Sequence, residues 1–258
     1  MCLILLALDT HPDYSLIVAA NRDEFYDRST ARAAFWKDDP RVLAGRDLKA
    51  GGTWLGIDRR GRFAAVTNYR QGQREAGTLR SRGRLVSDYL TERIVGRAHV
   101  ERVEREGARY KGFNLIAGDV QALFYISNRD GGVRALRPGV YGLSNHLLDS
   151  PWPKVTAGKS GLCELLAGGG ELIPRLFELL SDRRQATDAS LPRTGVSPEW
   201  ERLLSSAFIT SEAYGTRSST VVLVGRGGGV TFVERSFGPG PALEGEIRYE
   251  YDIEREAL

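Results

Sequence analysis

Position 2 of this 258-residue chain holds one of its two cysteines, directly behind Met1. Removal of Met1 would leave Cys2 with a thiol and a free α-amine on the same residue. The α-amine titrates near pH ~8 and a free thiol near ~8.5, so the amine can accept the thiol proton without a histidine. Cys2 is therefore a candidate nucleophile. The alternative is a small buried hydrophobic residue at the start of a strand.

The first hairpin decides which side chain lies beside Cys2. Two apolar runs, 2–8 and 15–20, flank a proline–aspartate turn signal. A turn centred on this signal places Asp23 directly opposite Cys2. Opposed residues of neighbouring strands have their Cβ atoms about 4.5–5.5 Å apart. We therefore expect the Asp23 carboxylate to lie beside the amine and the thiol of Cys2; its alternative role is to cap the loop that follows.

The pattern of apolar residues indicates how these strands are covered. Both faces of the first strand are apolar, which is typical of a strand buried on two sides. Further strand-like runs occur towards both ends of the chain, and helical patterns lie at 153–166 and 172–180. This order predicts stacked sheets flanked by helices. The length fits one large domain, 1–258.

An arginine-rich stretch, 70–84, precedes an amphipathic helical pattern. Its arginines are Arg70, Arg74, Arg80, Arg82 and Arg84. The default interpretation is a solvated loop. The alternative is recognition of an anionic ligand, because guanidinium groups bind phosphates and carboxylates in a bidentate manner.

Composition excludes several classes of protein. Hydrophobic residues make up 41% of the chain and the formal charge is +3, which is ordinary for a globular protein and gives no indication of nucleic-acid binding. No run approaches the ~18 apolar residues of a transmembrane segment, and the apolar start is too short for an export signal. Two distant cysteines and three scattered histidines predict neither a disulfide framework nor a metal site. We expect a cytoplasmic protein.

Short motifs that occur in order over nearly the whole chain carry a resemblance to a known family. They lie at 1–2, 19–26 (Ala-Ala-Asn-Arg-Asp-Glu-Phe-Tyr), 51–56 (Gly-Gly-Thr-Trp-Leu-Gly), 67–69, 112–115, 141–145 and 214–217. Together they resemble the Asn-Arg-Asp-Glu (NRDE) family, also called the transport and Golgi organisation protein 2 family. More distantly, the pattern is similar to the N-terminal nucleophile cysteine hydrolases of the penicillin V acylase and bile salt hydrolase group. The resemblance implies an α+β fold, a four-layer αββα sandwich of two mainly antiparallel sheets.

The hydrolase resemblance also implies a set of catalytic residues. By position these are Cys2, Asp23, Asn68, Asn145 and Arg217. Cys2 would attack an acyl carbon, Asp23 would hold the α-amine, and the two asparagines would donate hydrogen bonds to the oxyanion. The structural alternatives are asparagines that bond to the backbone and an Arg217 that forms a buried ion pair with Asp23.

One departure from the hydrolase pattern concerns an arginine. The hydrolase group carries one shortly before the aspartate, where this chain has Ala20. Arg22 is nearby, but by alternation it points to the opposite face from Asp23. The residues that we expect to contact a ligand are Asn21, Arg22, Trp54, Tyr69, Arg70 and His146.

Two functions follow from the resemblance. The first is an amidohydrolase that uses no cofactor and cleaves the C–N bond of a small, non-peptide acyl amide. The second is a non-catalytic carrier or chaperone of haem, acyl-coenzyme A or a lipid, in which the same pocket binds a small amphipathic ligand. Against haem, the sequence has no cysteine-proline or paired-histidine arrangement that supplies an axial iron ligand.

Overall fold

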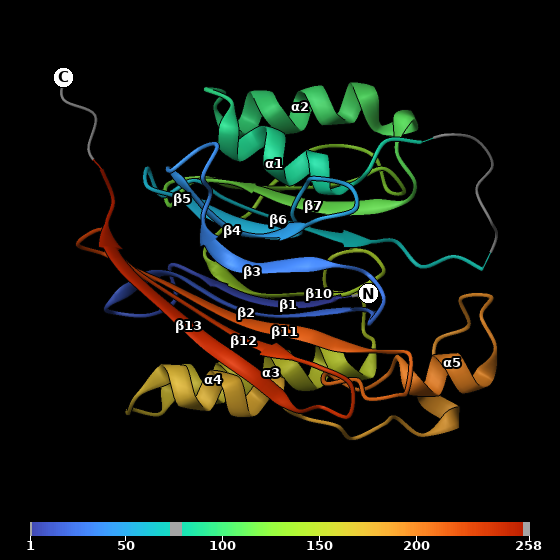
Figure 1. The fold of residues 1–258 in the computed structure, drawn as a ribbon. Helices are drawn as coiled ribbons and strands as arrows, with labels where there is room; N and C mark the ends of the chain where they lie inside the picture. The colour runs from blue at the N-terminus through green and yellow to red at the C-terminus, as the bar shows by residue number, and fades with distance from the viewer. Residues whose placement is uncertain (1, 73–78, 255–258) are drawn as a thin grey trace.

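The computed structural model describes residues 2–72 and 79–254, which form stacked layers (Figure 1). The predictions made for Met1 and Arg74 lie outside this part of the chain. Within the described residues, one sheet has the strand order β10-β1-β2-β11-β12-β13 and the other the order β3-β4-β5-β6-β7-β8-β9. All paired neighbours in both sheets run antiparallel.

The strands of the first sheet come from both ends and the middle of the chain. They are β10 (Gly139–Leu143), β1 (Cys2–Leu8), β2 (Tyr14–Phe25), β11 (Tyr214–Gly225), β12 (Gly229–Phe237) and β13 (Leu243–Asp252). The strands of the second sheet follow one another in sequence. They are β3 (Thr30–Phe35), β4 (Val42–Asp47), β5 (Leu55–Asp58), β6 (Phe63–Asn68), β7 (Phe113–Gly118), β8 (Leu123–Ser127) and β9 (Arg134–Ala135).

Helices cover the outer face of each sheet (Figure 1). The second sheet carries α1 (Gly83–Thr91) and α2 (Gly96–Glu106), followed by a 3₁₀ turn, η1 (Gly107–Arg109). The first sheet carries α3 (Pro153–Ala167) and α4 (Leu172–Leu180). The short elements η2 (Asp188–Ser190) and α5 (Pro198–Leu203) lie before β11. No helix of the described residues is long and apolar enough to cross a membrane.

Three apolar cores separate the layers and confirm the predicted αββα sandwich. The side chains of Ile4, Leu6 and Leu8 point between the two sheets. Those of Leu3 and Leu5 point towards α3 and α4 instead. A third core joins the second sheet to α1 and α2. The prediction that β1 is buried on both faces is therefore confirmed.

The register of the first hairpin differs from the prediction by one residue. Cys2 pairs with Arg22, and Leu8 with Leu16. The loop is centred on Pro12 rather than between Pro12 and Asp13. Asp9 adopts a left-handed conformation (φ 51°), and its N–H donates to the Ser15 carbonyl at 2.9 Å. A slip of one residue exchanges the two faces of a strand. The predicted pairing of Cys2 with Asp23 is therefore wrong, and Arg22 stands opposite Cys2.

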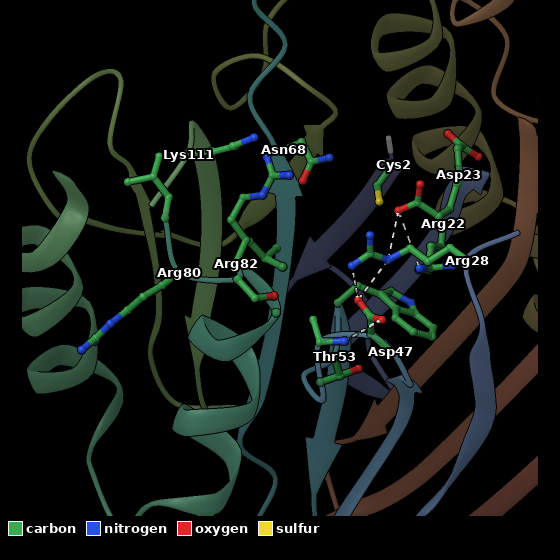
Figure 2. Close-up of a pocket in the computed structure, with 17 residues that line it drawn as sticks. Cys2, Arg22, Asp23, Arg28, Asp47, Thr53, Asn68, Arg80, Arg82 and Lys111 are labelled. Carbon is green, nitrogen blue, oxygen red and sulfur yellow. Dashed lines mark hydrogen bonds and ion pairs between the residues drawn. The ribbon is translucent and has the colours of Figure 1, made fainter. Parts of the chain in front are cut away.

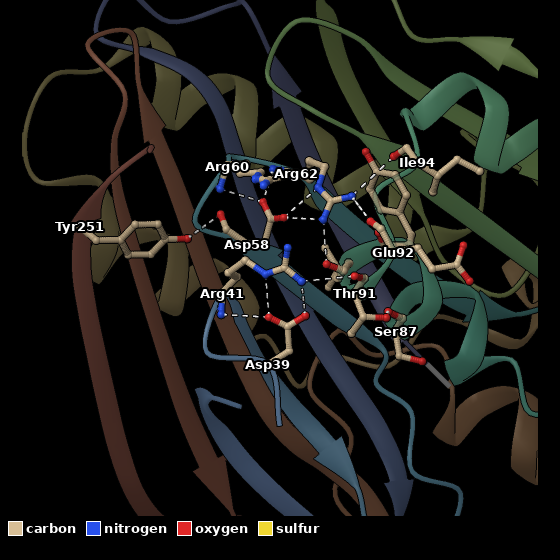
Figure 3. Close-up of polar contacts among 12 residues, drawn as sticks. Asp39, Arg41, Asp58, Arg60, Arg62, Ser87, Thr91, Glu92, Ile94 and Tyr251 are labelled. Carbon is tan, nitrogen blue, oxygen red and sulfur yellow. Dashed lines mark hydrogen bonds and ion pairs between the residues drawn. The ribbon is translucent and has the colours of Figure 1, made fainter. Parts of the chain in front are cut away.

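A buried arginine network joins the β5–β6 turn to the end of α1 (Figure 3). Nε of Arg62 donates to Oδ2 of Asp58 at 2.7 Å. Its Nη1 donates to the carbonyls of Tyr89 (3.1 Å) and Glu92 (2.6 Å), and its Nη2 to that of Leu90 (2.8 Å). The last carbonyls of a helix have no partner within the helix, so the guanidinium acts as a cap for α1.

Candidate functional site

A cavity of about 300 Å³ opens at the start of β1, between the ends of the two sheets. Cys2, Trp54 and Asn68 line it. The cations in its wall are Arg22, Arg28, Arg80, Arg82 and Lys111, and the carboxylates are Asp23, Glu24 and Asp47. Figure 2 shows the Cys2 sulfur at the cavity, with Arg22 and Arg28 on one side and Arg82 and Lys111 on the other.

The Cys2 side chain is half-buried and belongs to the cavity rather than to the apolar core. Burial raises the pKa of its thiol, while the Arg22 guanidinium and a hydrogen bond from the Asp23 backbone act in the opposite direction. Its carbonyl accepts a hydrogen bond from the Ser144 hydroxyl at 2.9 Å. The first residue of β1 is thus fixed through its backbone and leaves its sulfur at the cavity.

Asp23 lies beside the start of β1 but projects mainly to the helix side of the sheet. It is 1% exposed, and the Thr216 hydroxyl donates to its Oδ1 at 2.7 Å. Because β1 and β2 are antiparallel, the backbone nitrogen of Cys2 lies at the end of β1 nearest Asp23. Burial raises the pKa of this carboxyl, and Lys154 is the strongest influence that lowers it. The Asp23 carboxylate and the backbone nitrogen of Cys2 therefore lie at the same end of the sheet.

Arg22 is the cation directly opposite Cys2 in the sheet. Its guanidinium stacks on Trp54 at 4.3 Å from the ring centroid, and Nη2 lies 3.8 Å from Oε2 of Glu24. Within the described residues, Nη1 is buried and has no hydrogen-bond partner. Trp54 packs against Gly45, where an added Cβ would clash with the indole ring. Arg22 and Trp54, both predicted to contact a ligand, form one wall of the cavity.

The two predicted asparagines occupy different places. Asn68 ends β6 and lines the cavity. Asn145 is fully buried, and its Nδ2 donates to the backbone carbonyl of Asn68 at 3.0 Å. Asn68 is therefore available at the cavity, whereas Asn145 positions it. This is the backbone role that the sequence left open for Asn145.

Arg217 and Asn21 hold the scaffold together. Nη1 of Arg217 donates to the carbonyls of Phe25, Tyr26 and Arg28, beyond the end of β2. The guanidinium is directed at these carbonyls and Thr216 contacts the carboxylate, so this arrangement does not favour the alternative of an ion pair between Arg217 and Asp23, which stays a prediction. Asn21 Nδ2 donates to the carbonyls of Leu180 and Ala207, both at 2.8 Å, and is buried on the helix side of the sheet.

Tyr69, Arg70 and His146 form a cluster that does not line the Cys2 cavity. The His146 ring lies between Tyr69 (5.0 Å between centroids) and Trp152 (5.7 Å). Arg70 forms a buried ion pair with Glu201 at 2.6 Å and stacks on Trp152. These contacts join the end of β6 to α5 and to the start of α3. Ligand contact by these three residues stays a prediction that this arrangement does not favour.

Three residues of the site were not among the predicted site residues, although Thr67 and Ser144 lie within the motifs at 67–69 and 141–145. The Thr67 hydroxyl donates to the Ser144 carbonyl at 2.6 Å, and Ser144 in turn holds Cys2. Lys154 is buried near Asp23 and acts on its ionisation. Serine, threonine and lysine are common residue types, and only the fold brings these three to the start of β1. By contrast, the arginine-rich stretch did indicate Arg80 and Arg82, which line the cavity.

The family model for Transport and Golgi organisation 2 matches residues 1–239. The chain belongs to this family. The cattle (Bos taurus) Transport and Golgi organization protein 2 homolog is 40% identical over 280 residues, covering 98% of this chain and 100% of the relative. The Drosophila melanogaster Transport and Golgi organization protein 2 is 30% identical over 262 residues, covering 92% of each. The predicted family is therefore confirmed.

Solved structures confirm the predicted type of fold. Penicillin V acylase from Agrobacterium tumefaciens has a TM-score of 0.52 at 11% identity, covering 98% of this chain and 86% of that chain. A Caenorhabditis elegans ortholog of N-acylethanolamine-hydrolyzing acid amidase has a TM-score of 0.50 at 12% identity, covering 86% and 92%. At such low identity the likeness shows the fold alone.

Proposed function

We propose that this protein is an N-terminal cysteine amidohydrolase that cleaves a small acyl amide carrying an anionic group. The observation that supports this most directly is the place of Cys2: its thiol lines a cavity together with Arg22 and Asn68, while its backbone nitrogen lies towards Asp23. A purely structural cysteine would be packed among apolar side chains. The proposed activity requires removal of Met1, which exposes the α-amine.

In the proposed reaction the α-amine of Cys2 takes the thiol proton, and the thiolate attacks the acyl carbon. The side-chain NH₂ of Asn68 donates to the oxyanion, where one such donor contributes about 3–4 kcal/mol to the transition state. The C–N bond then breaks, and the α-ammonium gives its proton to the leaving amine. Water hydrolyses the thioester in the second half, which releases the acid and returns the thiol.

The charges around the cavity support an anionic substrate. Among its carboxylates, Asp47 is paired with Arg28 at 2.5 Å, and Glu24 lies 3.8 Å from both Arg22 and Arg28. The cations therefore exceed the carboxylates, and one donor of Arg22 has no partner within the described residues. A carboxylate or phosphate on the substrate would satisfy this donor.

Acylation of Cys2 tests the proposal. The protein is treated with p-nitrophenyl acetate, and adducts are mapped by peptide mass in a Cys163→Ser background, because Cys163 is an exposed free thiol. We expect an intact mass without Met1, an adduct at Cys2, and neither adduct nor turnover in Cys2→Ala. Asn68→Ala should keep the adduct site but acylate about 10²–10³-fold more slowly. Retained Met1 with no adduct at residue 2 would refute the hydrolase.

A second function is supported by the thiol itself. Burial raises the pKa of Cys2, which favours an uncharged and unreactive thiol in this environment. The same cavity would then serve a non-catalytic carrier of an amphipathic anion such as haem, acyl-coenzyme A or a lipid. Titration with haemin, followed in the Soret region, should saturate at one equivalent for a haem carrier. Arg22→Met and Arg82→Met should weaken this binding, and uptake without saturation contradicts it.

The two thiols also support a cytoplasmic location. Cys2 and Cys163 are both free, and a reducing compartment keeps them so. Fractionation of cells that produce the protein at native levels should place it with cytosolic markers. Recovery in an oxidising compartment would contradict this assignment.

A further inference from the structure

Lys154 is a buried lysine whose amine has no hydrogen-bonding partner in the part of the chain that the structure describes. It is the second residue of α3, is 5% exposed, and its Nζ makes no hydrogen bond within the described residues. A lysine is expensive to bury unless something nearby favours its charge. A nearby carboxylate is the kind of group that would favour the charge of Lys154.

The position of α3 brings Lys154 to the start of β1. Its side chain lines the same hollow as Leu3 and Ala207. Leu3 pairs with Asn21 in the sheet, and Asn21 contacts the Ala207 carbonyl. Lys154 thus lies over the start of β1 and the last residues of β2, on the face of the sheet that the helices cover. That is the side to which Asp23, two residues beyond Asn21, directs its carboxylate.

Groups from several elements act on Asp23. Among the described residues they are Cys2 on β1, Arg22 on β2, Tyr26 after β2, Thr216 and Tyr214 on β11, Lys154 on α3, and Arg70 after β6. Arg70 is matched by Glu201 at 2.6 Å, and Arg22 lies on the opposite face of the sheet against Trp54. Thr216 is uncharged. Lys154 is therefore the side chain best placed to balance the charge of Asp23.

We infer that Lys154 is a positioning residue that keeps Asp23 ionised, so that the carboxylate can hold the α-amine of Cys2. This inference rests on the proposed hydrolase function. A buried carboxyl without a cation takes up a proton, and a neutral carboxyl holds an ammonium group poorly. Mutual influence supports the pairing: Lys154 lowers the pKa of Asp23, and Asp23 opposes the burial that lowers the pKa of Lys154 to about 8.

The test compares Lys154→Met, Lys154→Gln and Lys154→Arg in the Cys163→Ser background. The rate of Cys2 acylation by p-nitrophenyl acetate is followed from pH 5 to 9. Without the lysine charge, we expect the acid limb of the profile to move up by at least about one pH unit, with the plateau rate retained. Lys154→Arg should restore the original limb. A profile that superimposes on the parent, or falls equally at every pH, overturns the inference.

A second measurement does not depend on turnover. The Asp23 carboxyl is titrated by ¹³C NMR on protein labelled at aspartate Cγ, with Asp23→Asn to assign its signal. We expect the midpoint of the Asp23 titration to rise when the lysine charge is removed. It is measured in Lys154→Met or Lys154→Gln, whichever variant has the higher thermal unfolding temperature. An unchanged midpoint overturns the inference. A shifted midpoint in a protein whose Cys2 never acylates keeps the electrostatic pairing and refutes the hydrolase alone.

Discussion

Two buried arginines of this protein are used in opposite ways. Arg62 directs each guanidinium nitrogen at an acceptor, the Asp58 carboxylate or the last carbonyls of α1 (Figure 3). Arg22 stacks on Trp54, keeps a loose ion pair with Glu24, and leaves Nη1 without a partner among the described residues (Figure 2). The complete set of acceptors gives Arg62 a structural role, whereas the open donor of Arg22 beside the Cys2 cavity is the one that we propose for a ligand.

The largest effect on the free energy of unfolding is expected when the Arg62 network is broken. Arg62→Met leaves the buried Asp58 carboxylate without its cation, which should lower the free energy of unfolding by about 3–5 kcal/mol. Urea unfolding measures this loss. The double variant Arg62→Met/Asp58→Leu should recover part of it, because no charge is then left unpaired. A loss below about 1 kcal/mol for the single variant would mean that the network contributes little.

Lys154 is expected to have an intermediate effect on the free energy of unfolding, and this effect depends on pH. Its pKa is about 8 in the folded protein against an ordinary 10.5, so the unfolded chain binds more protons between these values. Stability contributed through this residue should therefore rise with pH from about 8 to 10.5, by up to about 3 kcal/mol. Urea unfolding at pH 8 and pH 10.5 measures the rise. Lys154→Met should lack it, and an equal rise in both proteins contradicts the prediction.

A smaller effect on stability is expected at Arg22, whose set of hydrogen-bond acceptors is incomplete. Arg22→Met removes a donor that has no partner, so the free energy of unfolding should change by less than about 1 kcal/mol. The electrostatic effect appears in reactivity instead. In the Cys163→Ser background, the rate ratio of iodoacetate to iodoacetamide at Cys2 should fall about tenfold, since only iodoacetate is anionic. Arg97→Met, an exposed change on α2, should leave the ratio as it was.

Another small effect concerns the hydrogen bond that holds Cys2. Ser144→Ala removes the hydroxyl that donates to the Cys2 carbonyl at 2.9 Å. We expect a loss of about 1 kcal/mol in the free energy of unfolding, the usual contribution of one hydrogen bond. Thermal unfolding measures it, with Ser160→Ala on the exposed face of α3 as the matched control. Equal losses in both variants would show that the hydrogen bond from Ser144 to Cys2 contributes no more to stability than a surface hydroxyl.

The family and the layers of the fold were predictable from the sequence because their signals are local. The two apolar faces of β1 and the helical spacing at 172–180 are present within single elements. The register was not predictable in this way, because a left-handed Asp9 shifts the centre of the loop. One residue of slip was enough to exchange Asp23 for Arg22 opposite Cys2.

The site was predictable in part, for a similar reason. Residue types that suit catalysis also suit internal support, and the choice depends on partners far away in sequence. Arg70 pairs with Glu201, 131 residues along the chain, and Asn21 bonds to the carbonyl of Ala207, 186 residues away. No pattern of neighbouring residues reveals such partners, so Arg70 and Asn21 were assigned to a ligand. Lys154 was missed because its counterpart Asp23 belongs to another layer.

The hydrogen bonds from Asn114 through Thr67 and Ser144 to Cys2 connect the second sheet to the first residue of the first sheet. Cys2 therefore takes its position from both halves of the sandwich at once. Small changes in how the halves are spaced, made by substitutions deep in the interior, would alter thiol reactivity well before they unfold the protein. Loss of the proposed activity can thus begin far from the sulfur, in variants whose thermal unfolding is unchanged.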